Sequence, residues 1–340
     1  MDTTKMPTTH STSRLLAALA LGFAATGCAS TTPQAEAEVV IETSSGAVRN
    51  LVRLTSSVDA ERNPVVSPDG QKVAFNVDKD GQLDIISIDT RTGLARTQIT
   101  NHKSHDMHPA WMPDSERIVF SSNRLGRLGL WIQNASGRGG TTMITRSQDM
   151  MDFGPSVSPD GTTICFTSRG RAAIKEVGIT EAGFRTYEVF EGALPHIWFV
   201  NTDGTNLTQF GKGIYPTWSP DGERIAYCSN SGGSWDIWLM DRDGSAMTQI
   251  TSNDGNQIAP SFSPDGAWLA YISNLSGNFD LWVMRTDGTA ATQLTIDSSE
   301  EGNPCWGADG NIYFCSRKTG NWDIWKLTPV LAQGLNPQPE

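Results

Sequence analysis

Three histidines in the first third of the chain are spaced by three residues. His102, His105 and His108, with Asp106 between the last two, are three of the chain's 5 histidines. Imidazole and carboxylate are ligands of divalent transition metals. A segment that leads into an extended strand need not bring the three rings together, so the alternative is an ordinary loop. The histidines are candidates for a metal site, and no cofactor is assigned.

A second acidic segment resembles part of a calcium-binding loop. Residues 78–84 read DKDGQLD, but they lack the glutamate that completes an EF-hand at the required distance. An Asp-Gly pair between two apolar runs is also typical of a hairpin turn, which is the favoured interpretation. The chain contains no G-x-S-x-G motif, so it has no signature of the α/β-hydrolase domain.

A repeated motif indicates how these residues are arranged. Six copies begin at Ser67, Met112, Ser158, Ser219, Ser263 and Gly307, and most of them read Ser-Pro-Asp-Gly. The steps between their aspartates are 45, 46, 61, 44 and 44 residues. A fixed period of this size is typical of propellers and solenoids.

Each repeat contains four short runs of β-branched and aromatic residues, separated by Asp-Gly or Asn/Gly turns. Such runs are typical of strands joined by hairpins. The sequence therefore predicts an all-β, six-bladed β-propeller with four strands per blade. The last repeat lacks its fourth strand, and residues 46–55 match that strand. We expect this N-terminal strand to complete the last blade and close the ring.

We name the strands of a blade a to d, from the innermost outwards. The a–b and c–d turns are short, whereas the b–c and d–a connections vary and share the opposite face. Functional residues tend to lie on such loops. The longest repeat has an insertion at residues 169–195, within which residues 174–190 are expected to form an extra hairpin or a lid.

The tryptophans and cysteines are interpreted as structural. Trp131, Trp198, Trp238, Trp282 and Trp325 recur at one position of strand c, which favours packing between blades over a sugar-binding surface. Cys228 and Cys315 share a strand-b position, and Cys165 also lies on strand b. Free buried thiols are favoured, with a Cys305–Cys315 bridge as the alternative.

The N-terminal segment predicts export. Residues 15–27 are apolar, follow Lys5 and Arg14, and are too short for a stable membrane span. They end in Ala-Thr-Gly before Cys28, which resembles a bacterial lipobox with Cys28 as the lipidated residue. The alternative is a cleaved signal and a soluble periplasmic protein. Ala29 favours the periplasmic face of the outer membrane, by resemblance to enterobacterial lipoproteins.

The expected organisation is a signal peptide at 1–27, a flexible tether at 28–45, the propeller at 46–328 and a tail at 329–340. The formal net charge is −11. A nucleic-acid-binding protein carries a basic stripe, so this charge argues against DNA or RNA as a partner.

The repeats resemble the TolB-like propeller family, whose Pro-x-Trp/Phe-Ser-Pro-Asp-Gly stretch stands here at residues 216–222 and 260–266. The separate α/β domain that precedes the propeller in TolB has no counterpart in this chain. In TolB the peptidoglycan-associated lipoprotein docks on the d–a loops at the propeller mouth. The resemblance therefore implies a partner-binding set before each strand-a proline: Glu61, Arg62, Asn63, Asp106, Met107, His108, Asp152, Phe153, Tyr215, Gln257, Glu301 and Asn303.

The expected function is non-enzymatic recognition of an envelope protein, either Tol-Pal-related or wall-associated, by a lipid-anchored propeller. A metal-dependent propeller enzyme of the lactonase or lyase type is the alternative, supported by the histidine cluster. A small-ligand sensor is a further alternative.

Overall fold

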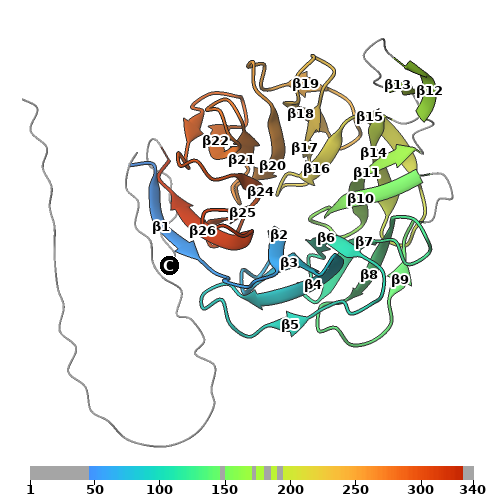
Figure 1. The fold of residues 1–340 in the computed structure, drawn as a ribbon, viewed down its shortest axis with the longest axis horizontal. Helices are drawn as coiled ribbons and strands as arrows, with labels where there is room; N and C mark the ends of the chain where they lie inside the picture. Colours follow the sequence, from blue (N-terminus) through green and yellow to red (C-terminus); the bar gives the residue numbers. More distant parts are fainter. Residues whose placement is uncertain (1–45, 146–149, 171–173, 180–184, 190–193, 332–340) are drawn as a thin grey trace, which may run out of the picture. The chain divides into compact units, whose positions relative to one another are not determined.

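Six four-stranded antiparallel sheets are arranged around a common axis, as the sequence predicted (Figure 1). The computed structural model describes residues 46–145, 150–170, 174–179, 185–189 and 194–331. Cys28 and the signal and tether segments lie outside these residues. Within the described residues, no helix is long and apolar enough to cross a membrane.

Five blades follow the order a to d along the chain. Blade 1 comprises β2 (Ala60–Val66), β3 (Lys72–Lys79), β4 (Gln82–Asp89) and β5 (Thr97–Gln98). Blade 2 comprises β6 (Asp106–Trp111), β7 (Arg117–Ser122), β8 (Gly129–Asn134) and β9 (Thr142–Met143). Blade 3 comprises β10 (Met150–Val157), β11 (Thr163–Gly170), β14 (Pro195–Asn201) and β15 (Thr208–Lys212). Blade 4 comprises β16 (Ile214–Trp218), β17 (Arg224–Ser229), β18 (Asp236–Asp241) and β19 (Thr248–Gln249). Blade 5 comprises β20 (Gln257–Phe262), β21 (Trp268–Ser273), β22 (Asp280–Arg285) and β23 (Thr292–Gln293).

Blade 6 is built from both ends of the propeller, which confirms the predicted closure. Its strands are β24 (Glu301–Trp306), β25 (Ile312–Ser316), β26 (Asp323–Pro329) and β1 (Val48–Arg53). β1 pairs antiparallel with β26, so that Val48 lies opposite Pro329 and Arg53 opposite Trp325. This pairing removes two strand edges that would otherwise be free to pair with another chain.

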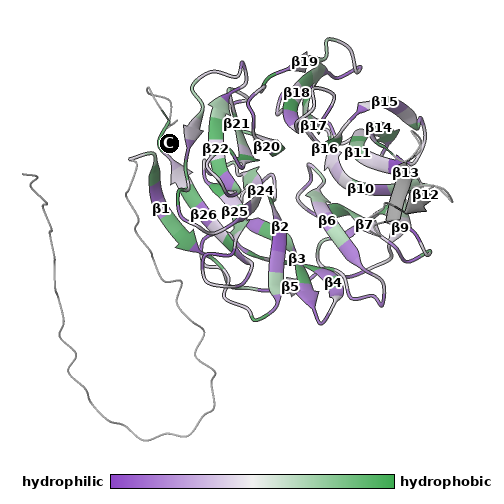
Figure 2. Ribbon diagram, turned by 45° about the horizontal axis from the view of Figure 1, so that its top comes forward, coloured by the Kyte–Doolittle hydropathy of each residue, from purple (hydrophilic) through white to green (hydrophobic). Residues whose placement is uncertain are grey.

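The hydrophobic core lies between neighbouring blades. One cluster combines Val119 and Leu130 of blade 2 with Ile164 and Phe166 of blade 3, and equivalent clusters join the other neighbouring blades. The recurring strand-c tryptophans belong to these clusters, as expected from their periodicity. Figure 2 shows hydrophobic colouring along strands such as β21 and β22 and hydrophilic colouring in many loops. Each blade therefore depends on its neighbours for burial of its apolar faces.

The repeated Ser-Pro-Asp-Gly motif forms the a–b turn. In blade 4 the Ser219 hydroxyl donates to Asp221 Oδ1 at 2.5 Å and accepts from Arg224 N–H at 2.9 Å. Gly222 follows with φ of 72°, a left-handed conformation that glycine adopts without steric cost. The motif thus recurs because it closes this hairpin.

The acidic segment at residues 78–84 is a hairpin turn, and the insertion contains a separate pair of strands. In residues 78–84, Asp80 and Gly81 have positive φ and connect β3 to β4, with Lys79 opposite Gln82, so this segment is the hairpin turn that was favoured. The insertion contains β12 (Ile174–Ile179) and β13 (Arg185–Val189), which pair with each other in a separate two-stranded sheet.

Candidate recognition face and central cavity

Every strand a contains a β-bulge directly before its proline. In all six blades the a–b register shifts at this point. The residue before the proline has a positive φ, which is 57° in Asn63, 52° in His108, 60° in Gly154, 51° in Tyr215, 53° in Ala259 and 47° in Asn303. Non-glycine residues rarely adopt this conformation. The positive φ at this position is therefore determined by the packing of strand a around the axis rather than by the residue type.

Side chains of the preceding blade hold three of these residues by their backbone N–H groups. Asn76 Oδ1 accepts from His108 N at 3.1 Å, and Thr167 Oγ1 accepts from Tyr215 N at 3.0 Å. Cys228 Sγ accepts from Ala259 N at 3.2 Å. The three acceptors occupy the same position of strand b, so the bulge and its neighbouring blade form one hydrogen-bonded unit.

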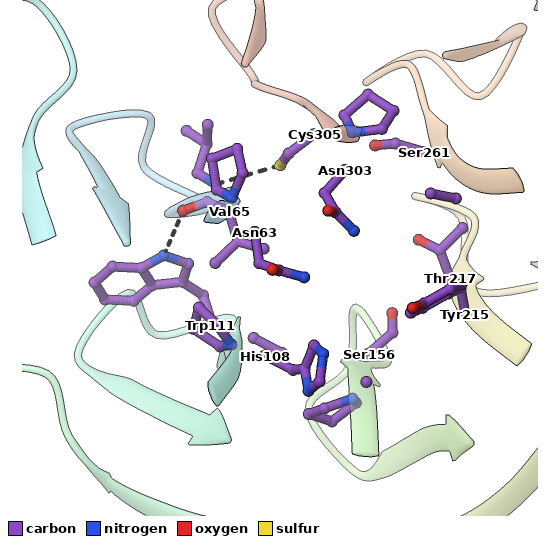
Figure 3. A pocket seen from close by; sticks show the side chains of 18 of the residues that line it. Asn63, Val65, His108, Trp111, Ser156, Tyr215, Thr217, Ser261, Asn303 and Cys305 are labelled. Carbon is purple, nitrogen blue, oxygen red and sulfur yellow. Dashed lines mark hydrogen bonds between the residues drawn. The ribbon is translucent and has the colours of Figure 1, made fainter. Parts of the chain in front are cut away.

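The six bulges surround a cavity on the axis of the propeller. It encloses about 280 Å³ and is lined by residues from every strand a. Figure 3 shows Asn63 and Asn303 projecting towards its centre from strands a of the neighbouring blades 1 and 6, with His108, Ser156 and Tyr215 on the remaining wall. None of the lining residues is Asp, Glu, Lys or Arg. The cavity therefore offers neutral hydrogen-bonding groups against a background of proline and valine.

His108 is a neutral imidazole in this setting. Burial lowers the pKa of its ring to about 4. Its Nδ1 is buried and has no hydrogen-bond partner within the described residues, and its ring centroid lies 5.9 Å from that of Phe153. At neutral pH the ring can therefore donate one hydrogen bond and accept another.

The histidine cluster does not converge on a metal site. His102 is exposed and its Nδ1 accepts from Ser104 N at 3.1 Å, while His105 Nδ1 accepts from Leu83 N at 3.4 Å. His108 lines the cavity. In the part of the chain that the structure describes, no group of three His, Cys, Asp or Glu side chains could hold a metal ion. His102 and His105 lie before β6 and bind different backbone N–H groups, whereas His108 lies in the bulge of β6, an arrangement that sequence spacing could not show.

The acidic residues that the sequence analysis placed in the partner-binding set are buried at the start of strand a. Glu61, Asp106, Asp152 and Glu301 are all at most 4% exposed, as is the amide Gln257 at the equivalent position of blade 5, and each begins or lies near the beginning of its strand. Their side chains therefore do not form a free acidic rim.

Most of these carboxylates accept hydrogen bonds from hydroxyl or guanidinium groups. Asp106 accepts two hydrogen bonds from Arg124 Nη2, both at 3.0 Å, and Asp152 accepts from Thr145 and Ser168, both at 2.6 Å. These contacts connect strand a to loops and strands of the same face, so the acids have a structural role.

Glu61 and Glu301 carry the largest shifts among these acids. Burial raises the pKa of each carboxyl to about 7. Glu301 accepts hydrogen bonds from Thr295, Ser299 and Ser316 at 2.7–2.9 Å, and the Arg96 guanidinium lies 3.4 Å from Glu61. These contacts only partly offset desolvation.

The other predicted partner-binding residues are more accessible. Arg62 is exposed and its guanidinium carbon lies 5.2 Å from the Trp322 ring centroid, while Met107 and Phe153 are partly buried. Asn63, His108, Tyr215 and Asn303 line the cavity. The structure thus divides the predicted set into buried supports, cavity residues and a short outer rim.

Amide side chains of the b–c loops hold the backbone of the following d–a loops. Asn321 Nδ2 donates to the carbonyls of Ser57 and Asp59 at 3.1 and 3.0 Å. Asn278 makes the equivalent contacts to residues 297 and 299, and Gln82 to residues 102 and 104. The loops of this face, which we call the mouth face, are therefore held in defined positions in three blades.

Exposed aliphatic side chains lie on the loops of the mouth face, and two of them belong to d–a loops held in this way. Val58 is 97% exposed between the two carbonyls that Asn321 binds, and Ile296 is 53% exposed beside Asp297. Leu125 and Leu275, in b–c loops, are 58% and 49% exposed. The sequence analysis missed these four residues, although an aliphatic residue inside a polar loop is a visible signal.

The described cysteines are free thiols, as favoured from the sequence. Cys165, Cys228, Cys305 and Cys315 form no disulfide. Cys305 accepts a hydrogen bond from Val66 N at 3.3 Å, and Cys315 donates to the Gly302 carbonyl at 3.2 Å. Both sulfur atoms therefore have partners other than each other.

Comparisons with known proteins agree with this architecture. Tol-Pal system protein TolB of Francisella tularensis is 26% identical over 214 residues, which are 62% of this chain and 45% of that protein. The chain spans about half the length of the curated relatives it matches. TolB from Acinetobacter baumannii superposes with a TM-score of 0.54 and 19% identity, covering 80% of this chain and 63% of that structure.

An enzyme shares the same fold. Oligogalacturonate lyase from Vibrio parahaemolyticus superposes with a TM-score of 0.56 and 15% identity over 86% of this chain and 96% of the lyase. Similarity at these identities shows the fold alone. A family model described as the TolB beta propeller domain matches residues 31–191 and 196–330. The match covers most of the chain, which therefore belongs to the TolB beta-propeller domain family.

Proposed function

We propose that this protein is a non-enzymatic recognition module of the cell envelope, whose mouth face binds another envelope protein. The partner class is a peptidoglycan-associated lipoprotein or another wall-linked protein, in line with the Tol-Pal relative.

The observation that carries the proposal is the placement of Val58. A side chain that is 97% exposed is held outwards by two hydrogen bonds from Asn321 to its neighbours in the chain. Exposing an aliphatic side chain brings no benefit to folding, whereas its burial in an interface is favourable. Because the loop is already ordered, a partner does not have to supply its ordering entropy.

The exposed aliphatic residues are distributed around the mouth face. Val58, Leu125, Leu275 and Ile296 come from loops of blades 1, 2, 5 and 6 and from the connections between them. An interface of ordinary size, roughly 800 Å² per partner, spans several such loops. Arg62, Met107 and Phe153 supply further contacts in this proposal, while the buried acids keep strand a in position.

The proposal includes export and lipid anchoring at Cys28. The apolar run at residues 15–27 and the small residues before Cys28 support it. Radiolabelled palmitate should be incorporated into the wild-type protein and not into a Cys28→Ser variant, which should be released into the soluble fraction. Equal membrane association of the two proteins would contradict lipidation at this residue.

The neutral cavity favours recognition over lyase or lactonase chemistry. Proton abstraction or lactone hydrolysis needs a general base, a charged group or a metal close to the reacting carbon. The cavity lining contains no carboxylate, lysine or arginine, and the pKa of its one imidazole, that of His108, is lowered to about 4, which makes this ring a weak proton acceptor. The buried acids of strand a instead have structural partners.

Site-specific photo-crosslinking in cells tests the mouth face. A photoreactive residue at position 58 or 296 should produce one discrete crosslinked species with an envelope protein, identified by mass spectrometry. Leu207 is the matched control, because it is 53% exposed like Ile296 but follows the c–d turn on the opposite face. Crosslinks from position 207 and none from 58 or 296 would move the interface away from the mouth face.

A further inference from the structure

We propose that the central cavity is a binding site for one neutral pyranose sugar. This site is separate from the protein-binding surface, because its groups lie on the axis rather than on the outer loops. The proposal does not depend on the protein partner described above.

The charge of the cavity selects an uncharged ligand. The chain has a formal net charge of −11, yet none of the residues that line the cavity is Asp, Glu, Lys or Arg. An ionised ligand in this cavity would lose hydration without meeting an opposite charge, which is costly. His108 does not supply a charge, since its pKa is lowered to about 4.

The distribution of polar groups selects a ligand with hydroxyl groups around its perimeter. Asn63 and Asn303 project inwards from blades 1 and 6, and His108 and Tyr215 come from blades 2 and 4 (Figure 3). Ser261 of blade 5 already accepts from Trp306 N at 3.0 Å, so its own proton remains to be donated. Amide, imidazole and hydroxyl groups can both donate and accept, as sugar hydroxyls do.

The size and lining of the cavity fit a ligand that consists of one sugar ring. A volume of about 280 Å³ lies at the lower end of the range for small-molecule sites. Between the polar side chains the walls consist of prolines, Val65, Val66 and Trp111, which can pack against the C–H faces of a pyranose. A small pre-formed site of this kind needs little rearrangement on binding.

Saturation-transfer difference NMR on the purified full-length protein tests the proposal. The probes are D-glucose, D-galactose and N-acetyl-D-glucosamine, with D-glucuronate as the charged comparison. At least one neutral sugar should receive saturation and titrate with a Kd on the order of millimolar, and glucuronate should bind at least about tenfold more weakly.

Two substitutions by glycine distinguish the contribution of the Asn303 side chain to binding from that of the backbone bulge. Asn303→Gly removes an amide from the cavity while keeping a residue that adopts positive φ, so the bulge is retained. It should weaken sugar binding about tenfold, the loss expected for one hydrogen bond left unmade. Ala259→Gly is the matched control, because it changes the equivalent bulge of blade 5 without removing a polar group.

Three results would overturn the proposal. They are an absence of saturation transfer to all three neutral sugars, tighter binding of glucuronate, or equal loss of binding in the Ala259→Gly control. Any of these results would leave the crosslinking test of the mouth face unaffected, because that test does not use the cavity.

Discussion

The buried acids at the beginning of strand a include two glutamates whose pKa values are raised into the neutral range. Glu61 and Glu301 lie at equivalent positions of blades 1 and 6, and burial raises the pKa of both to about 7. The hydrogen bonds of Glu301 to three hydroxyl groups do not fully replace its hydration. Each acid therefore makes folding stability depend on pH in the neutral range.

Glu301→Gln should remove one such dependence. The folded-state pKa of about 7 exceeds the ordinary value of 4.5, so the folded protein holds an extra proton between these pH values. The resulting stabilisation is complete below pH 4.5 and is lost as pH rises through 7. Relative to wild type, the variant should gain on the order of 2 kcal/mol between pH 4.5 and pH 8.

Urea unfolding of both proteins at several pH values measures this difference. Glu300→Gln is the control, because its side chain is exposed next to the buried one. Parallel stability curves for Glu301→Gln and wild type would contradict the raised pKa.

At the level of the element, the threonine two residues after strand d joins the end of that strand to the beginning of strand c. Thr251 Oγ1 accepts from Ile237 N at 2.9 Å and donates to Asp236 Oδ1 at 3.1 Å. Thr295 bonds in the same way to Leu281 N and Glu301. The repeated Gln-Leu/Ile-Thr sequence therefore has a hydrogen-bonding reason as well as a strand-forming one.

Thr251→Val should destabilise the protein by about 2–3 kcal/mol, because it leaves the buried Ile237 N–H without a partner and removes one of the hydrogen bonds to the buried Asp236 carboxylate. Thr248→Val, at an exposed residue of the adjoining strand β19, should have little effect. Chemical denaturation of the two variants makes the comparison. Similar losses in both would show that strand propensity, rather than this hydroxyl, explains the conserved spacing of the motif along the chain.

The periodicity of the sequence was sufficient to predict the strands, but it did not predict the β-bulges in strand a. Turn chemistry identifies every Ser-Pro-Asp-Gly hairpin, and alternation identifies the strands between them. The bulge residues are Asn, His, Gly, Tyr, Ala and Asn, of which only Asn and Gly commonly adopt positive φ. The bulge is therefore imposed by packing around the axis, so neither the cavity nor the separation of the three histidines was visible in the sequence.

The complete ring depends on β1, which supplies the outer strand of blade 6. Leu51 of β1 is 7% exposed and packs in the cluster between blades 5 and 6. Since each blade buries its faces against two neighbours, loss of this strand affects the whole ring rather than one blade. The prediction of closure from two incomplete repeats was correct for this physical reason.

Leu51→Asp should lower the free energy of unfolding by at least about 3 kcal/mol, because it places a charge in an apolar cluster. The denaturant midpoint should fall in a single transition observed alike by tryptophan fluorescence and circular dichroism. Leu94→Asp, at a side chain that is 44% exposed, is the control. A separate early transition confined to one probe would instead show that blade 6 unfolds independently.

The pairing of β1 with β26 also fixes where the chain enters and leaves the propeller. Val48 and Pro329 are opposite each other, and Val330 N donates to the Ala47 carbonyl at 2.7 Å. Both strands reach this point at the face that carries the a–b and c–d turns. A fusion domain, an affinity tag or a surface linkage added at residue 46 or residue 331 therefore begins on the side away from the mouth face. When the protein is immobilised through either position, its mouth face should remain accessible to a soluble partner.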